Sequence, residues 1–503
     1  MRQPRVERNS NLRLLMLVFC PHWYKQGIMT EIRSSMTAPG WGQHLRALIR
    51  IAAPLSFSQL SEMAMNVTDT ILLGGLGATA LAVGGMTTNL FFCTFITFQA
   101  ALGGASILIS RARGRAFAAQ GQLEDLSGIV TSGVLLALLL CLPVLAILLP
   151  AGSLLRFFNE PAIIVTQGSE FMHLLLWALL PDLVIIGLLR IILPAFGSER
   201  LLLWTMPGMA VLNGLLNYGL IHGRFGLPQM GLWGSACATI ATGWSVAILL
   251  VVLARSQSHL KLHLRLTRPD RAALGEMLRL GLPMMGATGA ELLAFQMTGL
   301  HAGALGAVSS AAHQIALSVT STAFMISLAL SQAVNIRVAY WLGAGAPAAA
   351  LRSTLGAVML VVLWTSFTAT MLLVFPQVVA GFYLDSGSAD AAAVMPVAIS
   401  LLKIAGIFQI LDGVQCVCSG ALRGCHDTFM PMLMMVLTYV PVSILGGDWL
   451  AFRAGYGAVG LWIGLAGGLG ILSVLLSVRL FFTLWRALEG TLSAAGQGCA
   501  DPA

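Results

Sequence analysis

Residues 50–62 read RIAAPLSFSQLSE, and residues 279–291 read RLGLPMMGATGAE. The two stretches lie 229 residues apart, and each places a glutamate, Glu62 or Glu291, eight residues after its proline. The tripeptide GLW, which first occurs at Gly231, recurs at the same offset of 229 residues. The sequence therefore predicts two copies of one structural unit.

The composition excludes a water-soluble protein. Of 503 residues, 57% are hydrophobic and 10% are charged, against about 45–50% and about 25% in soluble domains. A helix that spans a bilayer needs about 20 mostly apolar residues. Twelve segments qualify: 51–74, 89–110, 127–150, 168–192, 203–222, 231–254, 280–301, 312–336, 353–376, 393–418, 430–450 and 457–482. Six helices per copy return the chain to its starting side, so we expect an all-α polytopic membrane protein with two parallel six-helix bundles that face each other.

Basic residues fix the expected orientation, because they concentrate in cytoplasmic loops. The loops on one side carry fifteen basic residues: Arg111, Arg113, Arg115, Arg200, Arg255, Lys261, Arg265, Arg268, Arg271, Arg279, Arg337, Arg352, Arg423, Arg479 and Arg486. The opposite loops carry three: Arg156, Arg224 and Arg453. We therefore expect both termini in the cytoplasm.

The domain boundaries follow from these segments. We expect an N-terminal extension at 1–45, an N-lobe at 46–254, a cytoplasmic linker at 255–279, a C-lobe at 280–486 and a C-terminal tail at 487–503. The extension contains an apolar run too short to span, so it is either disordered or the product of a start codon assigned too far upstream. The basic linker is expected to be a solvated tether on the anionic leaflet.

Carboxylates within apolar segments are candidates for function, because burying their charge in a bilayer is costly. Five lie well inside the predicted segments: Glu62, Asp69, Asp182, Glu291 and Asp412. Arg190 and Lys403 are the nearby bases, and neither is expected to be a tight partner. An unpaired carboxylate at low dielectric can exchange a proton or a cation. If their two segments share a bundle core, Glu291 and Asp412 can meet.

A second polar set lies in the N-lobe. Asn213 and Asn217 are four residues apart and so share one helix face. With Asp69 and Thr239 they would supply four side-chain oxygens, enough for a cage that holds a hard cation or relays a proton. The alternative is that these groups only hold neighbouring helices together through hydrogen bonds.

Several function classes lack support. The sequence has no GxxxxGK[ST] phosphate-binding loop and no GxSxG nucleophile elbow. Its cysteines and histidines do not follow metal-site spacing; Cys416 and Cys418, for example, are not a CxxC pair. We therefore expect neither an enzyme nor a cofactor, a metal or a nucleic-acid partner.

Five stretches resemble the multidrug and toxic compound extrusion (MATE) family, NorM-type branch, and the resemblance covers nearly all of 46–486. They are PLSFSQLSEMAMNVTDTILLGG around Asp69, NGLLNYGLIHGRFGLPQMGLWGSACAT from Asn213, GLPMMGATGAELLAF around Glu291, AAHQIAL from Ala311 and FQILDGVQCVCSGALRGCHDT around Asp412. The resemblance implies twelve helices in two lobes and export of cationic amphiphilic compounds, driven by inward flow of protons or sodium ions.

The resemblance also implies roles for residues. Glu291 and Asp412 match the acids of the C-lobe coupling site, while Asp69, Asn213, Asn217 and Thr239 match the N-lobe polar site. Asp182 and Gln415 are further candidates.

Two positions depart from the family pattern. Phe408 stands where sodium-using relatives often have a tyrosine, which removes an oxygen ligand. Glu62 stands where related chains often carry glutamine, which adds an acid that could titrate.

We therefore expect a monomeric secondary antiporter in a bacterial inner membrane, whose lobes rock about a central cavity to alternate access. Its substrates would be cationic or amphiphilic small molecules. The coupling ion would be a proton, with sodium as the alternative. The alternative is a lipid-linked precursor flippase of the same broader superfamily. A flippase would favour a cavity rich in Arg and Lys, whereas the acids found here favour the antiporter.

Overall fold

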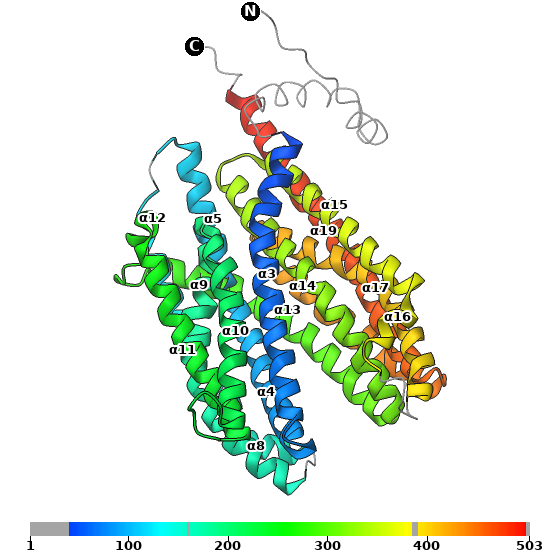
Figure 1. Ribbon diagram of the computed structural model, residues 1–503. Helices are drawn as coiled ribbons and strands as arrows, with labels where there is room; N and C mark the ends of the chain where they lie inside the picture. Colours follow the sequence, from blue (N-terminus) through cyan, green and yellow to red (C-terminus); the bar gives the residue numbers. More distant parts are fainter. Residues whose placement is uncertain (1–39, 122, 158–160, 385–390, 499–503) are drawn as a thin grey trace, which may run out of the picture.

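The computed structural model describes residues 40–121, 123–157, 161–384 and 391–498, and every regular element within these ranges is a helix (Figure 1). The expected N-terminal extension lies almost entirely outside the described residues. The last residues of the predicted extension, 41–45, are described and already form the start of the first helix, which begins at Trp41.

The N-lobe contains six long helical passages. The first passage is α3 (Trp41–Gly74), and the second joins α4 (Ala78–Gln99), η2 (Ala100–Leu102) and α5 (Gly103–Ala118). The third is α6 (Ser127–Leu148), and the fourth joins α8 (Ala162–Leu175), η3 (Leu176–Ala178), η4 (Leu180–Gly187) and α9 (Leu188–Phe196). The fifth and sixth are α10 (Arg200–His222) and α11 (Leu232–Ser256). Two short helices, α7 (Ala151–Phe157) and α12 (Ser258–Lys261), lie in connections.

The C-lobe repeats this arrangement. Its passages are α13 (Arg271–Ala304), α14 (Ala307–Gly343), α15 (Pro347–Val374), α17 (Ala391–Gly424), α18–η5–η6 (Phe429–Arg453) and α19 (Gly457–Gly498). The short α16 (Pro376–Gly381) precedes α17.

Length and apolar character identify nine of these passages as candidate membrane spans among the described residues. The other three, α3, α10 and α13, are long enough to span but do not meet the same criterion of apolar character. The predicted all-α polytopic fold is therefore confirmed. The helices extend beyond the predicted boundaries: α13 begins at Arg271, where Asp270 caps it by accepting a hydrogen bond from the Ala272 N–H at 2.9 Å.

Each lobe has a large hydrophobic core, and each core includes a few residues from the other lobe. The N-lobe core runs from Leu55 to Leu264 and also includes Met277 at the start of α13. The C-lobe core includes Leu48 and Ala52 from the start of α3. The first turns of α3 and α13 therefore each pack into the opposite lobe.

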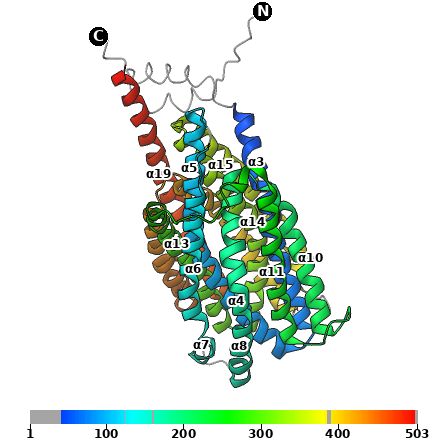
Figure 2. The same ribbon diagram turned by 90° about the vertical axis from the view of Figure 1, so that its left-hand side faces the viewer.

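The lobes meet closely at the end where α3 begins. Figures 1 and 2 both place α5 beside α14 at this end, and the ribbons of the two lobes diverge toward the other end in Figure 1. Two glycines allow the contact: a Cβ on Gly114 would overlap the Tyr340 carbonyl oxygen, and a Cβ on Gly343 would overlap backbone atoms of Arg111. His44 of α3 hydrogen-bonds Ser353 of α15 across the same interface at 3.0 Å.

The prediction of a solvated tether is wrong for the linker residues that precede α13. Leu260 and Leu264 lie one helical turn apart, so their side chains point in the same direction. Both are buried in the N-lobe core. Between them, the ring of His263 stacks on Phe196 with centroids 5.2 Å apart. The linker is therefore docked on the N-lobe.

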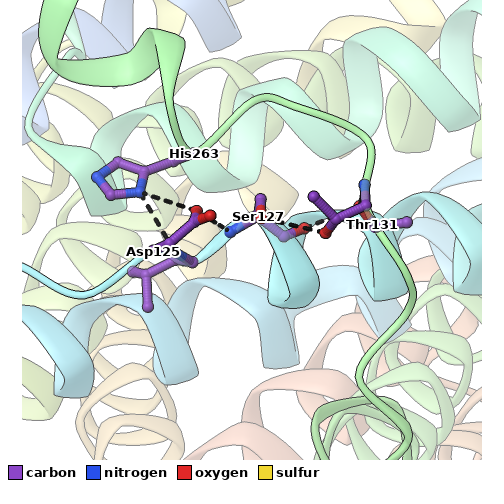
Figure 3. A network of polar contacts seen from close by, with 6 residues as sticks. Asp125, Ser127, Thr131 and His263 are labelled. Atoms are coloured by element: carbon purple, nitrogen blue, oxygen red, sulfur yellow. Dashed lines mark hydrogen bonds and ion pairs between the residues drawn. The ribbon is translucent and has the colours of Figure 1, made fainter.

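Hydrogen bonds hold the linker in place (Figure 3). His263 Nδ1 accepts from the Leu126 N–H at 3.3 Å and lies 3.9 Å from Oδ1 of Asp125. The Thr267 N–H donates to the Thr131 hydroxyl at 3.0 Å. Because Nδ1 is an acceptor here, the proton of the neutral imidazole is on Nε2.

Candidate functional site

The structure brings Glu291 of α13 and Asp412 of α17 together in the C-lobe. Their carboxyl groups are close enough to repel each other when both are ionised. Asp412 is 4% exposed, and its Oδ1 has no hydrogen-bond partner among the described residues. A pair of buried carboxyls in this arrangement binds a proton or a cation readily, because neutralising one of them removes the repulsion.

Two neighbours of this pair were missed at the sequence level. Tyr439 is fully buried in the π-helical turn η5 (Tyr439–Gly446), with its hydroxyl beside the Glu291 carboxyl. The charge of Arg423, at the end of α17, also acts on Glu291. A tyrosine inside an otherwise apolar segment was the signal available for the first of these contacts.

Phe408 and Gln415 flank Asp412 on α17. Phe408 is 1% exposed and packs edge-on against Phe295 and Trp462, with centroids 6.3 and 5.9 Å away. It supplies no oxygen to the site. Gln415 is buried, and its Oε1 has no hydrogen-bond partner in the described part of the chain.

A cavity of about 80 Å³ lies inside the N-lobe. Side chains of α3, α4, η4, α9, α10 and α11 line it, among them three phenylalanines: Phe91, Phe92 and Phe95. Three carboxyls and one guanidinium also line it: Glu62, Asp69, Asp182 and Arg190. The cavity therefore combines aromatic walls with an excess of acidic groups.

The predicted N-lobe polar set is largely brought together. Asn217 Nδ2 donates to Oδ1 of Asp69 at 2.8 Å and to Oδ1 of Asn213 at 3.0 Å. Both asparagines are fully buried. Thr239 lines the same cavity as Asp69, but its hydroxyl donates to the Ser235 carbonyl at 3.1 Å. The hydrogen bonds that link Asp69, Asn217 and Asn213 use only Oδ1 of Asp69, so its second carboxylate oxygen can accept a bond from a ligand.

The expectation that Arg190 is not a tight partner is wrong. Its Nη1 lies 2.5 Å from Oε2 of Glu62, and its Nη2 donates to Oε1 of Gln59 at 2.6 Å. The side chains of Arg190 and Glu62 are 11% and 23% exposed. Glu62 is therefore ion-paired, whereas Lys403 is exposed on α17.

Asp182 lies in the π-helical turn η4 (Leu180–Gly187), and such turns are frequent at functional sites. Its Oδ1 is buried without a hydrogen-bond partner among the described residues. The charge of Glu62 acts on it, so these two carboxyls are also neighbours.

No group of three or more His, Cys, Asp and Glu side chains that could hold a metal ion occurs in the described ranges. The chemistry that these sites offer is exchange of a proton or a monovalent cation at buried carboxyls, together with aromatic contact to an organic cation.

Comparison with known proteins shows the family of the chain. The MatE family matches residues 54–218 and again residues 283–447, which are offset by the 229 residues found in the repeat. The chain belongs to the MatE family. The duplicate match supports the parallel-repeat architecture.

Curated relatives cover nearly the whole chain. The multidrug resistance protein NorM of Burkholderia vietnamiensis is 42% identical over 89% of this chain and 96% of its own length. A probable multidrug resistance protein NorM of Burkholderia mallei is 44% identical over 91% of this chain and 97% of its own.

A solved structure shares the fold. It shows the outward-facing conformation of a multidrug resistance MATE family transporter, with a TM-score of 0.78 and 20% identity. The match covers 89% of this chain and 97% of that one.

Proposed function

We propose that this MatE family member is a secondary antiporter that exports cationic amphiphilic compounds. Its NorM relatives are named multidrug resistance proteins, which supports efflux of varied compounds. The observation that carries the proposal is the buried pair of Glu291 and Asp412. An ionised carboxylate attracts a cationic compound at low dielectric, whereas a neutralised one does not. Ion and substrate therefore weaken each other's binding by the same factor, which is the linkage that antiport requires.

The proposed coupling ion is the proton. Phe408 gives the C-lobe site no oxygen, so a sodium ion would have fewer ligands there than it prefers. Sodium is the alternative, with the Tyr439 hydroxyl and Oε1 of Gln415 as the replacement oxygens.

Transport would proceed by rocking of the two lobes. The glycine contacts between α5 and α14 close the end where α3 begins, and the lobes diverge at the other end. We place the closed end in the cytoplasm, together with both termini, because its loops carry most of the basic residues. In a bacterial inner membrane, the end at which the lobes diverge would then face the periplasm. The chain would function as a monomer without a cofactor.

The N-lobe cavity fits the proposed substrates better than those of a lipid-linked precursor flippase. A pyrophosphate headgroup needs an excess of basic groups, but three carboxyls face one guanidinium here. Phe91, Phe92 and Phe95 line the cavity, and aromatic rings favour a positively charged group close to them. No feature of the described site points to bond-breaking chemistry.

Efflux of a fluorescent cationic dye from proteoliposomes tests the proposal. We expect export under an imposed pH gradient alone. Export that requires a sodium gradient would replace the proton with sodium as the coupling ion. Absence of export of several such dyes under both gradients would contradict the proposed function.

A further inference from the structure

The coupling pair of the C-lobe has a counterpart in the N-lobe. Glu62 and Glu291 are equivalent under the 229-residue repeat. Asp182 follows Glu62 by 120 residues, and Asp412 follows Glu291 by 121. In each lobe, the glutamate is on the first passage and the aspartate on the fourth, and the two carboxyls act on each other electrostatically.

The two pairs differ in one respect. Arg190 holds Glu62 in an ion pair at 2.5 Å, and its second nitrogen is occupied by Gln59. In the C-lobe, Glu291 makes no such ion pair with any described residue, although the charge of Arg423 acts on it from the end of α17. The N-lobe pair therefore has one of its two negative charges permanently compensated.

Asp182 carries the remaining charge. Its Oδ1 is buried without a hydrogen-bond partner among the described residues and faces Gly243 of α11, where a Cβ would approach it to 2.9 Å. The other charged groups that line this cavity are Glu62 and Asp69 of α3 and Arg190 of α9. The cavity-lining residues of α4, α10 and α11 include no acidic or basic side chain. An ionised Asp182 in this position needs a cation or a proton.

We propose that Glu62, Asp182 and Arg190 form a second exchange site for a monovalent cation, occupied by a proton on Asp182 or by the ammonium group of a substrate. With Glu62 matched by Arg190, a proton on Asp182 makes the group of three neutral. Loss of that proton leaves one net negative charge on this group of three, beside the phenylalanines of the cavity, which suits one monovalent cation. This inference rests on the proposed antiport function and adds to it the exchange of a second proton, at Asp182.

Counting protons tests this site. The purified full-length protein would be mixed with ethidium, a monovalent aromatic cation, in weakly buffered detergent solution, and protons released per bound dye would be measured. We expect Asp182→Asn to release up to one proton fewer than the wild type while still binding the dye. Asp412→Asn should lose a comparable amount independently, and the double variant should lose the sum of the two amounts.

Substitutions of Arg190 provide a second readout. Arg190→Gln leaves Glu62 without its counter-charge, so Glu62 should take a proton as well and the released number should rise by up to one. Arg190→Lys keeps the charge and should behave as the wild type. A purely structural ion pair would alter thermal stability without changing the proton count.

If Asp182→Asn does not fold, Gly243→Ala tests the same group, because the added methyl group displaces the Asp182 carboxyl without changing charge. Unchanged proton release in the folded variants of Asp182 and Gly243 would overturn the second site. The C-lobe assignment fails separately, if Asp412→Asn releases as many protons as the wild type.

Discussion

Arg190 and Glu62 are joined by an ion pair of 2.5 Å between α9 and α3, across 128 residues of sequence. The pair holds the first and fourth passages of the N-lobe together inside the cavity that Asp69 and Asp182 also line. It compensates the charge of Glu62, whereas Glu291, the equivalent residue of the C-lobe, makes no ion pair with any described residue.

We predict that Arg190→Gln destabilises the protein, because it leaves a mostly buried carboxylate without its partner. The expected loss is about 1–3 kcal/mol, measured as a lower thermal unfolding temperature in detergent. The double variant Glu62→Gln/Arg190→Gln should recover much of this loss. Equal stability of the single variant and the wild type would show that the pair contributes nothing.

We expect Asn217→Ala to weaken both the fold and substrate binding. The substitution removes the donor that orients Asp69 and leaves buried acceptors on Asp69 and Asn213 unsatisfied. The cost should be about 1–3 kcal/mol, with several-fold weaker dye binding in a fluorescence titration. Asn89→Ala on the exposed part of α4 is the matched control and should leave both quantities unchanged.

The glycine contact between the lobes predicts a conformational effect. Asn335 Nδ2 of α14 donates to Ser106 Oγ of α5 at 3.5 Å, so cysteines at these two positions should be joined by a short thiol-reactive cross-linker in the closed state. Gly114→Val should reduce the yield of this cross-link several-fold, because its side chain collides with the Tyr340 backbone. Gly303→Val, at a helical glycine with open space around it, should not. Equal yields in both variants would contradict the closed interface.

The docked linker predicts a pH effect on stability. Burial lowers the pKa of His263, although the Asp125 carboxylate opposes the shift. Below the ordinary pKa of 6.5, the unfolded chain therefore binds more protons at this position than the folded chain does. The contribution of neutral His263 to the free energy of unfolding is complete above pH 6.5 and is lost as the pH falls toward the native pKa. Protonation would also remove the acceptor of the Leu126 N–H.

Thermal unfolding between pH 7.5 and 5 checks this effect. We expect His263→Gln to reduce the loss of stability at low pH, and His222→Asn, at an exposed position, to leave it unchanged. An identical pH profile for His263→Gln and the wild type would assign the effect to other groups.

Sequence periodicity and charge were sufficient for the architecture, because length, hydropathy and the repeat are local or regular properties of the chain. They also identified the candidate acids, since a carboxylate in an apolar segment is conspicuous. The ion pair of Arg190 was not predictable, because it joins residues 128 positions apart and depends on how α9 packs against α3. The position of Tyr439 beside Glu291 depends in the same way on the packing of η5 against α13, although a tyrosine in an apolar segment was a visible signal.

The docking of the linker also required the structure. Alternating leucines with basic residues are consistent with a surface tether, and only the packing shows that Leu260 and Leu264 reach the N-lobe core. The stacking of His263 on Phe196 depends on the end of α9, which is distant in sequence.

The central claim is that Glu291 and Asp412 couple ion flow to export, and transport by their neutral variants tests it most directly. Wild type, Glu291→Gln and Asp412→Asn would be reconstituted at equal protein density, and dye export would be driven by an imposed pH gradient. We predict that export falls at least tenfold in each variant while both remain folded. Export at the wild-type rate in either folded variant would contradict the account.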